Sequence, residues 1–575
     1  MGLPIIRREL SAASLCDSLH PVLQRVYRGR NITTMDELDT TAQSLSHYNQ
    51  LKGIDTAAEL LCQAIYEHKQ VTIVGDFDAD GATSTAICVL ALRQMGLNNV
   101  HYLVPNRFDF GYGLSEQIVD IACDEGAEVI LTVDNGIACL PGVRRAKERG
   151  ATVIVTDHHL PGETLPNADA IVNPNQPGCE FGSKNLAGVG VAFYLMLAIR
   201  ARLQAEDWFT RQQMAAPNLA NLLDIVAVGT VADVVVLDKN NRILVHQGLQ
   251  RIRAGKCRPG IKALFEVANR ELGRVGASDL GFVAGPRLNA AGRLDDMALG
   301  IECLLCDDPM QARYMASELD RLNQQRRTIE TDMKADAEAA ISAVTMDMET
   351  PPPALVIYNK DFHQGVIGIV AGRIKEKYKR PTIAFAHDDE YTIKGSARSV
   401  PGVHIRDVLE EVNLQSPGLI PKFGGHAMAA GLSLPLESLV EFERCFSQVV
   451  ERHLAQAGQV DAIVTDGELS EHELNLSVAH ILRQAVPFGQ GFEAPLFDGV
   501  FEVVNQRLLK GLHLKMALRL TSGEEVDAIA FNVDANAWPN TSIRYVQLAY
   551  QLDVNVFRGQ ETVQLLVQEI TACDQ

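Results

Sequence analysis

From Val71 to Thr156 the chain alternates short apolar runs with amphipathic stretches of about ten to fifteen residues. The runs have the length of buried strands, and the stretches between them have the length of helices. This alternation predicts a parallel sheet with right-handed crossovers, which is an α/β fold. The predicted strands are Val71–Val74, Val100–Val104, Val129–Val133 and Thr152–Thr156, and the predicted helices are Ala82–Met95, Ser115–Glu125 and Pro141–Arg149.

Side chains that can bind metals follow three of these strands. Any one of the three segments could be a turn, because Asp, Asn and Gly are good turn formers. The carboxyl ends of parallel strands meet at one edge of a sheet, however, so three such segments should converge. We therefore predict a metal site at this edge. The residues are Asp76, Asp78 and Asp80 after the first strand, Asp134 after the third, and Asp157, His158 and His159 after the fourth.

A further acid, Asp233, ends the apolar run Leu222–Ala232 and is a fourth candidate. Asp224 lies inside this run, where we expect it to cap or pair. Carboxylates with one or two imidazoles suit Mn²⁺ or Mg²⁺ better than zinc, and the set is large enough for two ions. Cys303 and Cys306 have zinc-like spacing but no second pair of cysteines or histidines, so we expect them to pack in the core.

Charge and length set limits on the function. The 575 residues carry 52 basic and 72 acidic side chains, a formal net charge of −20. This charge opposes binding to nucleic acid unless basic residues gather locally. The hydrophobic content of 47% excludes a disordered or fibrous protein. The sequence has no apolar run of about 18 residues and no signal-peptide pattern, so we expect a cytoplasmic protein without a membrane segment.

The pattern changes several times along the chain, which predicts several domains. Asp308-Pro309 should begin a long helix that continues to about Val344. The last part has short strands of period two, as in a small OB-like barrel that binds single-stranded nucleic acid. The expected parts are an N-terminal lead-in (1–68), a catalytic α/β domain (69–238), a helical segment with the long helix (239–350), a smaller α/β domain (351–455) and the barrel (460–575).

Basic and glycine-rich segments outside the acidic motifs are candidates for phosphate binding. Glycine lets a backbone approach a phosphate closely, and arginine can bind it with two hydrogen bonds. The alternative for each is a turn or an ordinary surface residue. In the barrel, Phe488, Phe492, Arg507, Lys510 and Lys515 could stack on bases and supply charge, or could pack in the core. The other candidates are Arg107, Arg287, Asn289, Arg293, Ser396, Arg398 and His426.

The acidic motifs, in their order, resemble the DHH phosphoesterase superfamily, which is named for a triplet like Asp157-His158-His159. The segments around Ser396 and His426 resemble the DHHA1 domain that accompanies it. The resemblance implies metal binding by Asp78, Asp80, Asp134, His158 and Asp233, and contact of His159 and His426 with the scissile phosphate. It also implies a pocket for the 5′-terminal phosphate, formed by Arg107, Ser396 and Arg398.

One position departs from the superfamily pattern. Many members have a histidine four residues before the acid that matches Asp78, and this chain has Val74 there. Asp76 is the candidate to replace that histidine as a ligand, with Asp134 as the carboxylate that bridges two ions.

The resemblance implies a 5′→3′ exonuclease for single-stranded DNA that releases 5′-mononucleotides in recombination and repair. Two Mn²⁺ or Mg²⁺ ions would serve hydrolysis. We expect a monomer that acts with single-strand-binding protein and a helicase. The alternatives are a superfamily enzyme for short oligonucleotides or cyclic dinucleotides, and a scaffold that binds DNA without cutting it.

Overall fold

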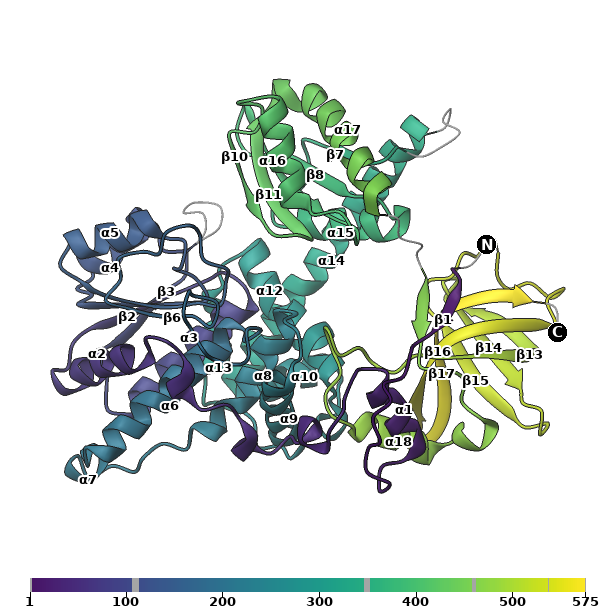
Figure 1. Cartoon of the computed structure of the whole chain (residues 1–575), viewed down its shortest axis with the longest axis horizontal. Coiled ribbons are helices and arrows are strands. Elements are labelled where there is room, and N and C mark those ends of the chain that lie inside the picture. Colours follow the sequence, from purple (N-terminus) through teal and green to yellow (C-terminus); the bar gives the residue numbers. More distant parts are fainter. Residues whose placement is uncertain (1–2, 106–112, 346–351, 458–461, 536, 574–575) are drawn as a thin grey trace. The chain divides into compact units, whose positions relative to one another are not determined.

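The computed structural model describes residues 3–105, 113–345, 352–457, 462–535 and 537–573 (Figure 1). The chain forms two compact units. Unit 1 contains Met1–Asn289, Met297–Ser317 and Asp461–Gln575, and unit 2 contains Ala290–Asp296 and Glu318–Val460. Most of unit 2 is therefore an insertion in the sequence of unit 1.

Unit 1 contains a parallel five-stranded sheet in the order β3-β2-β4-β5-β6. The four predicted strands are confirmed, whereas the short fifth strand was not predicted. All residues of β2 and β4 are buried, which explains why they read as unbroken apolar runs. The strands are β2 (Val71–Gly75), β3 (Val100–Leu103), β4 (Val129–Val133), β5 (Thr152–Thr156) and β6 (Ala170–Val172).

Helices cover both faces of this sheet (Figure 1). α4 (Glu116–Asp124) and α5 (Leu140–Glu148) enclose an apolar core on one face that includes Val74 and Ile130. On the other face α3 (Ala79–Gln94) packs against α6 (Gly188–Ala205) and α8 (Leu223–Ala232). α3 and α8 are buried almost all round, so neither shows an amphipathic pattern.

α6 is long and apolar enough to cross a membrane by length and composition, but 67% of it is buried inside the protein. It is a core helix. Unit 1 has further helices, and one of them, α18, packs against the C-terminal barrel. They are α1 (Pro21–Arg28), α2 (Ile54–Tyr66), α7 (Trp208–Arg211), α9 (Lys239–Arg253), α10 (Pro259–Val267), α11 (Ala277–Asp279), the π-helical segment η6 (Leu280–Ala284), α13 (Ala298–Leu305) and α18 (Leu476–Gln484).

The predicted barrel near the C-terminus is confirmed. It is closed, in the order β13-β14-β15-β17-β16, and this is the strand order of an OB-fold. The N-terminal β1 (Ile5–Arg7) pairs in parallel with β12 (Ile463–Thr465), which precedes the barrel. The barrel strands are β13 (Phe497–Leu509), β14 (His513–Arg519), β15 (Glu525–Ala530), β16 (Tyr545–Phe557) and β17 (Gln560–Cys573).

Buried contacts join the barrel region to the rest of unit 1. Arg30 Nη1 lies 2.7 Å from Asp466 Oδ1, and both side chains are almost fully buried. The guanidinium of Arg242 stacks over the ring of Phe492 at 4.4 Å, and Phe492 stacks on Phe488. Of the two interpretations of these phenylalanines, core packing is therefore correct for Phe492.

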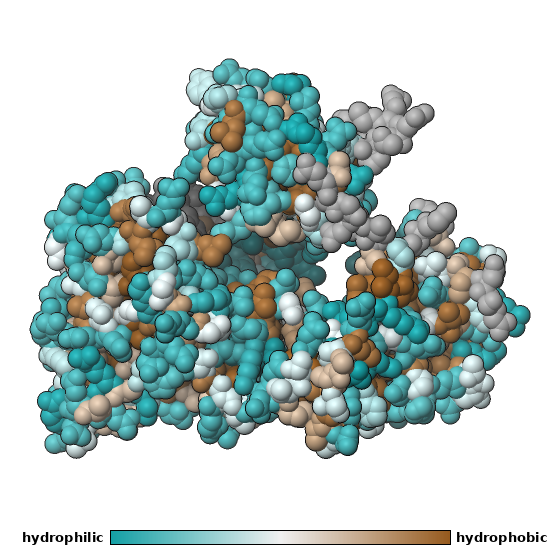
Figure 2. Space-filling view, in the orientation of Figure 1, coloured by the Kyte–Doolittle hydropathy of each residue, from teal (hydrophilic) through white to brown (hydrophobic). Residues whose placement is uncertain are grey.

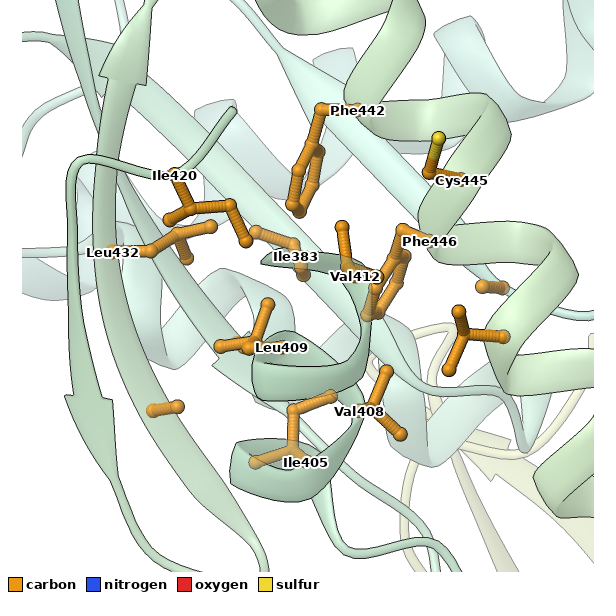
Figure 3. Close-up of a cluster of buried hydrophobic side chains, with 14 of the residues drawn as sticks. Ile383, Ile405, Val408, Leu409, Val412, Ile420, Leu432, Phe442, Cys445 and Phe446 are labelled. Atoms are coloured by element: carbon orange, nitrogen blue, oxygen red, sulfur yellow. The ribbon is translucent and has the colours of Figure 1, made fainter. Parts of the chain in front are cut away.

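Unit 2 is built on a mixed sheet in the order β10-β11-β9-β8-β7. α16 and α17 cover one face, and Phe442 and Phe446 from α17 meet Leu409 from α16 and Ile383 from β8 in the core (Figure 3). α15 and the second half of α14 cover the other face. The elements are β7 (Leu355–Tyr358), β8 (Thr382–His387), β9 (Thr392–Arg398), β10 (Lys422–Gly425), β11 (Ala429–Pro435), α15 (Ile367–Tyr378), α16 (Ile405–Gln415) and α17 (Leu439–Ala457).

The predicted long helix is α14 (Pro309–Thr345), with 37 residues. Asp308 caps it as expected, because its Oδ1 accepts hydrogen bonds from the amides of Met310 and Gln311 at 2.7 and 3.0 Å. α12 (Gly285–Leu294) occupies a segment for which a turn was one of the two interpretations. The face drawn in Figure 2 is mainly hydrophilic, with hydrophobic residues in small separate groups.

Candidate metal centre

The acids and histidines that follow the strands of unit 1 do converge. They form three overlapping groups, and within each group one ligand atom per residue lies within 4.8 Å of the others. Asp134 and His158 each belong to two groups, so the groups form one cluster. The groups are Asp76, Asp78 and Asp134; Asp134, His158 and His159; and Asp80, His158 and Asp233.

Strand register explains this convergence. Gly75 pairs with Val133, and Val133 pairs with Thr156, so the residues that follow these three strands begin at the same level. Asp134 has a left-handed backbone with φ of 61°, a conformation that Asp and Asn tolerate better than most residues. Asp233 comes from the C-terminal end of α8, so the fourth candidate follows a helix and not a strand.

Asp80 is held by the first turn of α6. The backbone amides of Gly188 and Val189 donate hydrogen bonds to its two carboxylate oxygens at 2.6 and 2.8 Å. Burial and the charge of Asp78 raise the pKa of Asp80 to about 7, although these two amides oppose the shift. The amides at a helix start stabilise a carboxylate that burial would otherwise keep protonated.

Asp78 caps α3 in the same turn. Its Oδ1 accepts hydrogen bonds from the amides of Asp80 and Gly81 at 2.9 and 3.1 Å. The next amide, that of Ala79, donates to Asn289 Oδ1 at 2.8 Å. The predicted DNA-contacting residue Asn289 therefore lies beside the acidic motif and supports its backbone.

His158 faces the acids as a neutral imidazole. Burial and the charge of His159 lower its pKa to about 4. Its buried Nε2 lies 3.2 Å from Asp134 Oδ1 and 3.5 Å from Asp233 Oδ2, and the described residues offer this atom no hydrogen bond of good geometry.

The charges of the acids are not balanced within the cluster. Burial, and then repulsion by Asp80 and Asp78, raise the pKa of both Asp134 and Asp233 well above the ordinary value. Buried carboxylates beside a neutral imidazole form a donor set that suits Mn²⁺ or Mg²⁺. The residues therefore fit a divalent metal centre.

Asp157 holds His159. Asp157 Oδ1 lies 2.7 Å from His159 Nδ1, and Asp157 also accepts hydrogen bonds from the amides of Ile137 and His158. Burial alone would lower the pKa of His159, but the hydrogen bond to Asp157 and the negative charge of Asp157 raise that pKa to about 9. His159 is therefore a cation at neutral pH, with 35% of its side chain exposed.

Val74 and Asp76 differ in position. Val74 is fully buried and packs in the apolar core under α4 and α5. Asp76 lies in the cluster with Asp78 and Asp134. Asp76, and not Val74, is therefore the residue of this pair that is placed to bind a metal.

The predicted phosphate-binding residues of unit 2 form their own group. Arg398 Nη1 donates to Ser396 Oγ at 3.0 Å, and burial lowers the pKa of Arg398. A Cβ on Gly368, at the start of α15, would lie 2.8 Å from Arg398 Nη2 and 2.9 Å from Ser396 Oγ. Gly368 therefore leaves room for these side chains beside a helix start, which suits an anion.

Of the other predicted contacts, two lie on α12 and one in a turn of unit 2. His426 is exposed in the turn between β10 and β11. Arg287 donates to Val283 O at 2.8 Å, and Arg293 donates to Gly365 O at 3.2 Å. Arg107 lies outside the described residues.

Two supporting residues were not predicted in these roles. Asn135 is fully buried, and its Nδ2 donates to Val74 O and Val133 O at 3.0 and 2.9 Å, which ties β2 to β4 beneath the cluster. Gly188 brings its amide to Asp80, and a Cβ there would lie 2.7 Å from Asp134 Cβ. The signal for Asn135 was its place directly after Asp134, in a segment that we interpreted as a turn or as part of the metal site.

Asp224 and the two cysteines with zinc-like spacing, Cys303 and Cys306, belong to none of the three metal-capable groups. Asp224 Oδ2 accepts a hydrogen bond from the Arg258 amide at 2.6 Å, so it pairs as expected. Cys303 is buried as expected, whereas Cys306 is only partly buried, so the expected core packing holds for Cys303 alone.

Comparison with known proteins covers the same parts of the chain. Residues 70–230 match the DHH family, N-terminal domain; residues 352–452 match the DHHA1 domain; and residues 465–569 match the RecJ OB domain. The single-stranded-DNA-specific exonuclease RecJ of Dickeya dadantii is 54% identical over 566 residues, which is 98% of each chain. The chain belongs to the RecJ family.

Other RecJ proteins agree. The single-stranded-DNA-specific exonuclease RecJ of Escherichia coli is 52% identical over 98% of each chain. The crystal structure of RecJ in complex with Mn²⁺ from Thermus thermophilus has a TM-score of 0.77 and 29% identity, and the match covers 100% of this chain and 80% of that one. The corresponding structure with Mg²⁺ has a TM-score of 0.74.

Proposed function

We propose that this chain is an exonuclease for single-stranded DNA that works from the 5′ end and releases 5′-mononucleotides. The observation that carries the proposal is the cluster of five buried or partly buried carboxylates with His158 in a chain of the RecJ family. A divalent cation at this cluster would supply an activated water and would stabilise the leaving oxygen. Two ions, Mn²⁺ or Mg²⁺, match the number of acids.

Each side chain in the cluster has a proposed task. Asp134 belongs to two of the three groups, so it is the carboxylate that two ions would share. Asp76 and Asp78 would complete one site, and His158 and Asp233 the other. Asp80 has both oxygens engaged by amides, so it would contribute its charge and hold the turn in addition to any ligand role.

His159 is suited to contact the scissile phosphate. Asp157 accepts a hydrogen bond from its Nδ1, and in the protonated ring Nε2 can also donate a hydrogen bond, to a phosphate oxygen. As a cation it would stabilise the negative charge that increases on that phosphate during hydrolysis. His426 is a proposed second donor.

We propose that the 5′ polarity comes from a site for the terminal phosphate, formed by Ser396 and Arg398 beside Gly368. Arg107, predicted from the sequence alone, is a further proposed contact of that phosphate. A guanidinium binds phosphate through two parallel hydrogen bonds. Arg287, Asn289 and Arg293 would contact the strand. The enzyme would act as a monomer in the cytoplasm during recombination and repair, with single-strand-binding protein and a helicase as partners.

Hydrolysis of defined substrates tests the function. Purified protein with Mn²⁺ or Mg²⁺ is given a 5′-phosphorylated single strand, the same strand as a duplex, a dinucleotide and a cyclic dinucleotide. We expect 5′-mononucleotides from the single strand, little from the duplex, and no product in EDTA. Hydrolysis of the dinucleotides alone would identify an oligonucleotide hydrolase instead, and no hydrolysis of any substrate would identify a scaffold.

A further inference from the structure

The segment that follows β6 lies beside the two histidines of the candidate metal centre. β5 and β6 are parallel neighbours that end at the same level, because Thr156 pairs with Val172. The next amide, that of Asp157, still donates a hydrogen bond to Val172 O at 3.1 Å. Residues 157–159, which follow β5, and residues 173–175, which follow β6, are therefore side by side.

Two asparagines of this segment donate hydrogen bonds to the backbone carbonyls of the histidines. Asn173 Nδ2 lies 2.9 Å from His159 O, and Asn175 Nδ2 lies 2.6 Å from His158 O. Asn173 is fully buried and Asn175 is partly buried. Asp157 Oδ1 accepts hydrogen bonds from the amides of His158 and His159 at 2.7 and 3.1 Å. Side chains therefore hold both the N–H and the C=O group of each histidine.

A turn in this segment does not by itself require these contacts. Asn173 Oδ1 accepts a hydrogen bond from the amide of Asn175 at 2.7 Å, which is the turn expected where an Asn side chain bonds to the backbone two residues on. That turn uses only the oxygen of the Asn173 side chain. The hydrogen bonds from the two Nδ2 groups to the histidines are additional to it.

The orientation of the His158 ring depends on its backbone. Its Nε2 lies 3.2 Å from Asp134 Oδ1 and 3.5 Å from Asp233 Oδ2, but the described residues give this atom no hydrogen bond of good geometry. A hydrogen bond with the Leu186 carbonyl supports the ring. The direction of Nε2 then follows from the peptide group that Asn175 holds. Residues that orient a metal ligand from behind typically change metal affinity by about 10–100-fold when they are replaced.

We propose that Asn173 and Asn175 are positioning residues of the metal centre, each with its own task. Asn175 holds His158 in the direction in which its Nε2 can meet a divalent cation. Asn173 holds His159 in the direction in which its ring can meet the scissile phosphate. The task of Asn173 rests on the proposed function, whereas the task of Asn175 requires only that the cluster binds a metal.

Mn²⁺ binding in the absence of DNA tests the task of Asn175. Electron paramagnetic resonance of free Mn²⁺ gives the Kd of the ion for the full chain and for the variant Asn175→Ala. We expect Kd to rise by about tenfold or more. Thermal unfolding in EDTA shows whether the variant folds, and Asn175→Ser, whose side chain is too short to reach His158 O, replaces it where it does not. A folded variant with the Kd of wild type overturns the proposal.

The matched control is Gln176→Ala. Gln176 is buried in the same segment, and its Nε2 donates hydrogen bonds to Ile171 O and Lys52 O at 2.8 and 3.0 Å. In the described part of the chain it makes no hydrogen bond with either histidine. We expect this control to have a lower Tm and the Mn²⁺ Kd of wild type. An equal loss of Mn²⁺ affinity in Gln176→Ala and Asn175→Ala would show a general effect on the segment and would overturn the proposal.

Hydrolysis of a 5′-phosphorylated single strand separates the two tasks. The kcat of Asn175→Ala should be low at limiting Mn²⁺ and should recover at saturating Mn²⁺, because the variant reduces the affinity for the ion. The kcat of Asn173→Ala should stay lower by about tenfold or more at saturating Mn²⁺, with an unchanged KM for the strand, since a contact to the reacting phosphate acts on the transition state. Asn173→Ser replaces this variant where it does not fold.

The outcomes distinguish this proposal from the proposed function. A kcat of Asn173→Ala that equals the wild-type value at saturating Mn²⁺ overturns the task of Asn173, and a kcat of Asn175→Ala that does not recover overturns the division of tasks. If wild type binds Mn²⁺ but hydrolyses no substrate, the proposed function fails and the task of Asn173 fails with it. The Kd of Mn²⁺ for Asn175→Ala then still supports or overturns the task of Asn175.

Discussion

Replacing Asp134 by Asn should make the metal-free protein more stable. Asp134 shares a group with Asp76 and Asp78 in which the ligand atoms lie within 4.8 Å, and two unit charges at that distance repel by about 3 kcal/mol at an effective dielectric constant of about 20. Asn has nearly the same shape and tolerates the φ of 61°. Ala would be strained there, so it is a poorer test.

The stability difference between the Asp134→Asn variant and wild type should change with pH. The pKa of Asp134 is raised in the folded state, so its contribution to stability is present below about pH 4 and is lost as the pH rises through the folded-state pKa. Asn does not titrate. In EDTA the advantage of the variant should therefore grow by up to about 1.4 kcal/mol per pH unit above pH 4.

Thermal unfolding in EDTA and in Mn²⁺ measures this effect. A gain of about 3 kcal/mol in the free energy of unfolding raises Tm by about 6–12 °C, because each kcal/mol raises the Tm of a domain the size of the DHH domain (residues 70–230) by about 2–4 °C. With Mn²⁺ the order should reverse, since saturation at about 100 times Kd adds about 2.7 kcal/mol to wild type. The Asp134→Asn variant should no longer hydrolyse single-stranded DNA.

Asp224→Asn is the matched control. Asp224 is also buried with a raised pKa, but its oxygens accept backbone hydrogen bonds from Arg258 and Ile225. This control should be less stable than wild type in both conditions and should keep the response to Mn²⁺. The reasoning is refuted if Asp134→Asn lowers Tm in EDTA as the control does, or if it still responds fully to Mn²⁺.

Two further predictions concern the residues around the phosphate. Gly368→Ala would place a methyl group 2.8 Å from Arg398 Nη2, so the preference for 5′-phosphate over 5′-hydroxyl ends should decrease. Tm should stay equal or rise, because Ala is favoured over Gly in helices. Hydrolysis rates of the two substrates measure the preference, and an unchanged preference would contradict the phosphate site. Asp157→Asn should lower the pKa of His159 from about 9 towards its ordinary value. The stability that the Asp157–His159 pair contributes is present below about pH 6.5 and is lost as the pH rises through about 9. The free energy of unfolding in urea should therefore decline over this range for wild type and not for the variant. An NMR titration that finds an unchanged His159 pKa in the variant would contradict the prediction.

The sequence predicted the sheet and the acidic cluster because both depend on local patterns. β2, β4 and β5 are apolar runs that end in acids, and register alone brings those ends together. β6 was missed because a three-residue strand has too few residues for a period. Asp233 was predicted as a candidate, although the run before it is a helix; a fully buried segment shows neither period.

Contacts between distant parts of the sequence could not be predicted. The segment of β1 was predicted only as part of an N-terminal lead-in, because no local pattern indicates that Ile5 pairs with Ile463. The role of Gly188 likewise depends on the approach of α6 to Asp80, which are 108 positions apart. Phe492 was ambiguous for the same reason, since Arg242 and Arg30 decide its environment.

The pairing of β1 with β12 has a consequence for how the molecule responds to cutting. In the sequence, unit 2 separates the α/β core from the barrel, although both belong to unit 1. The covalent link between the core and the barrel therefore runs through unit 2. The barrel is also held by the N-terminal segment, through β1 and through Arg30 and Asp466. Proteolytic cleavage inside unit 2 should therefore leave two fragments that migrate together on a sizing column and separate only in denaturant. That result would show that non-covalent contacts within unit 1, and not the covalent link through unit 2, hold the barrel to the core.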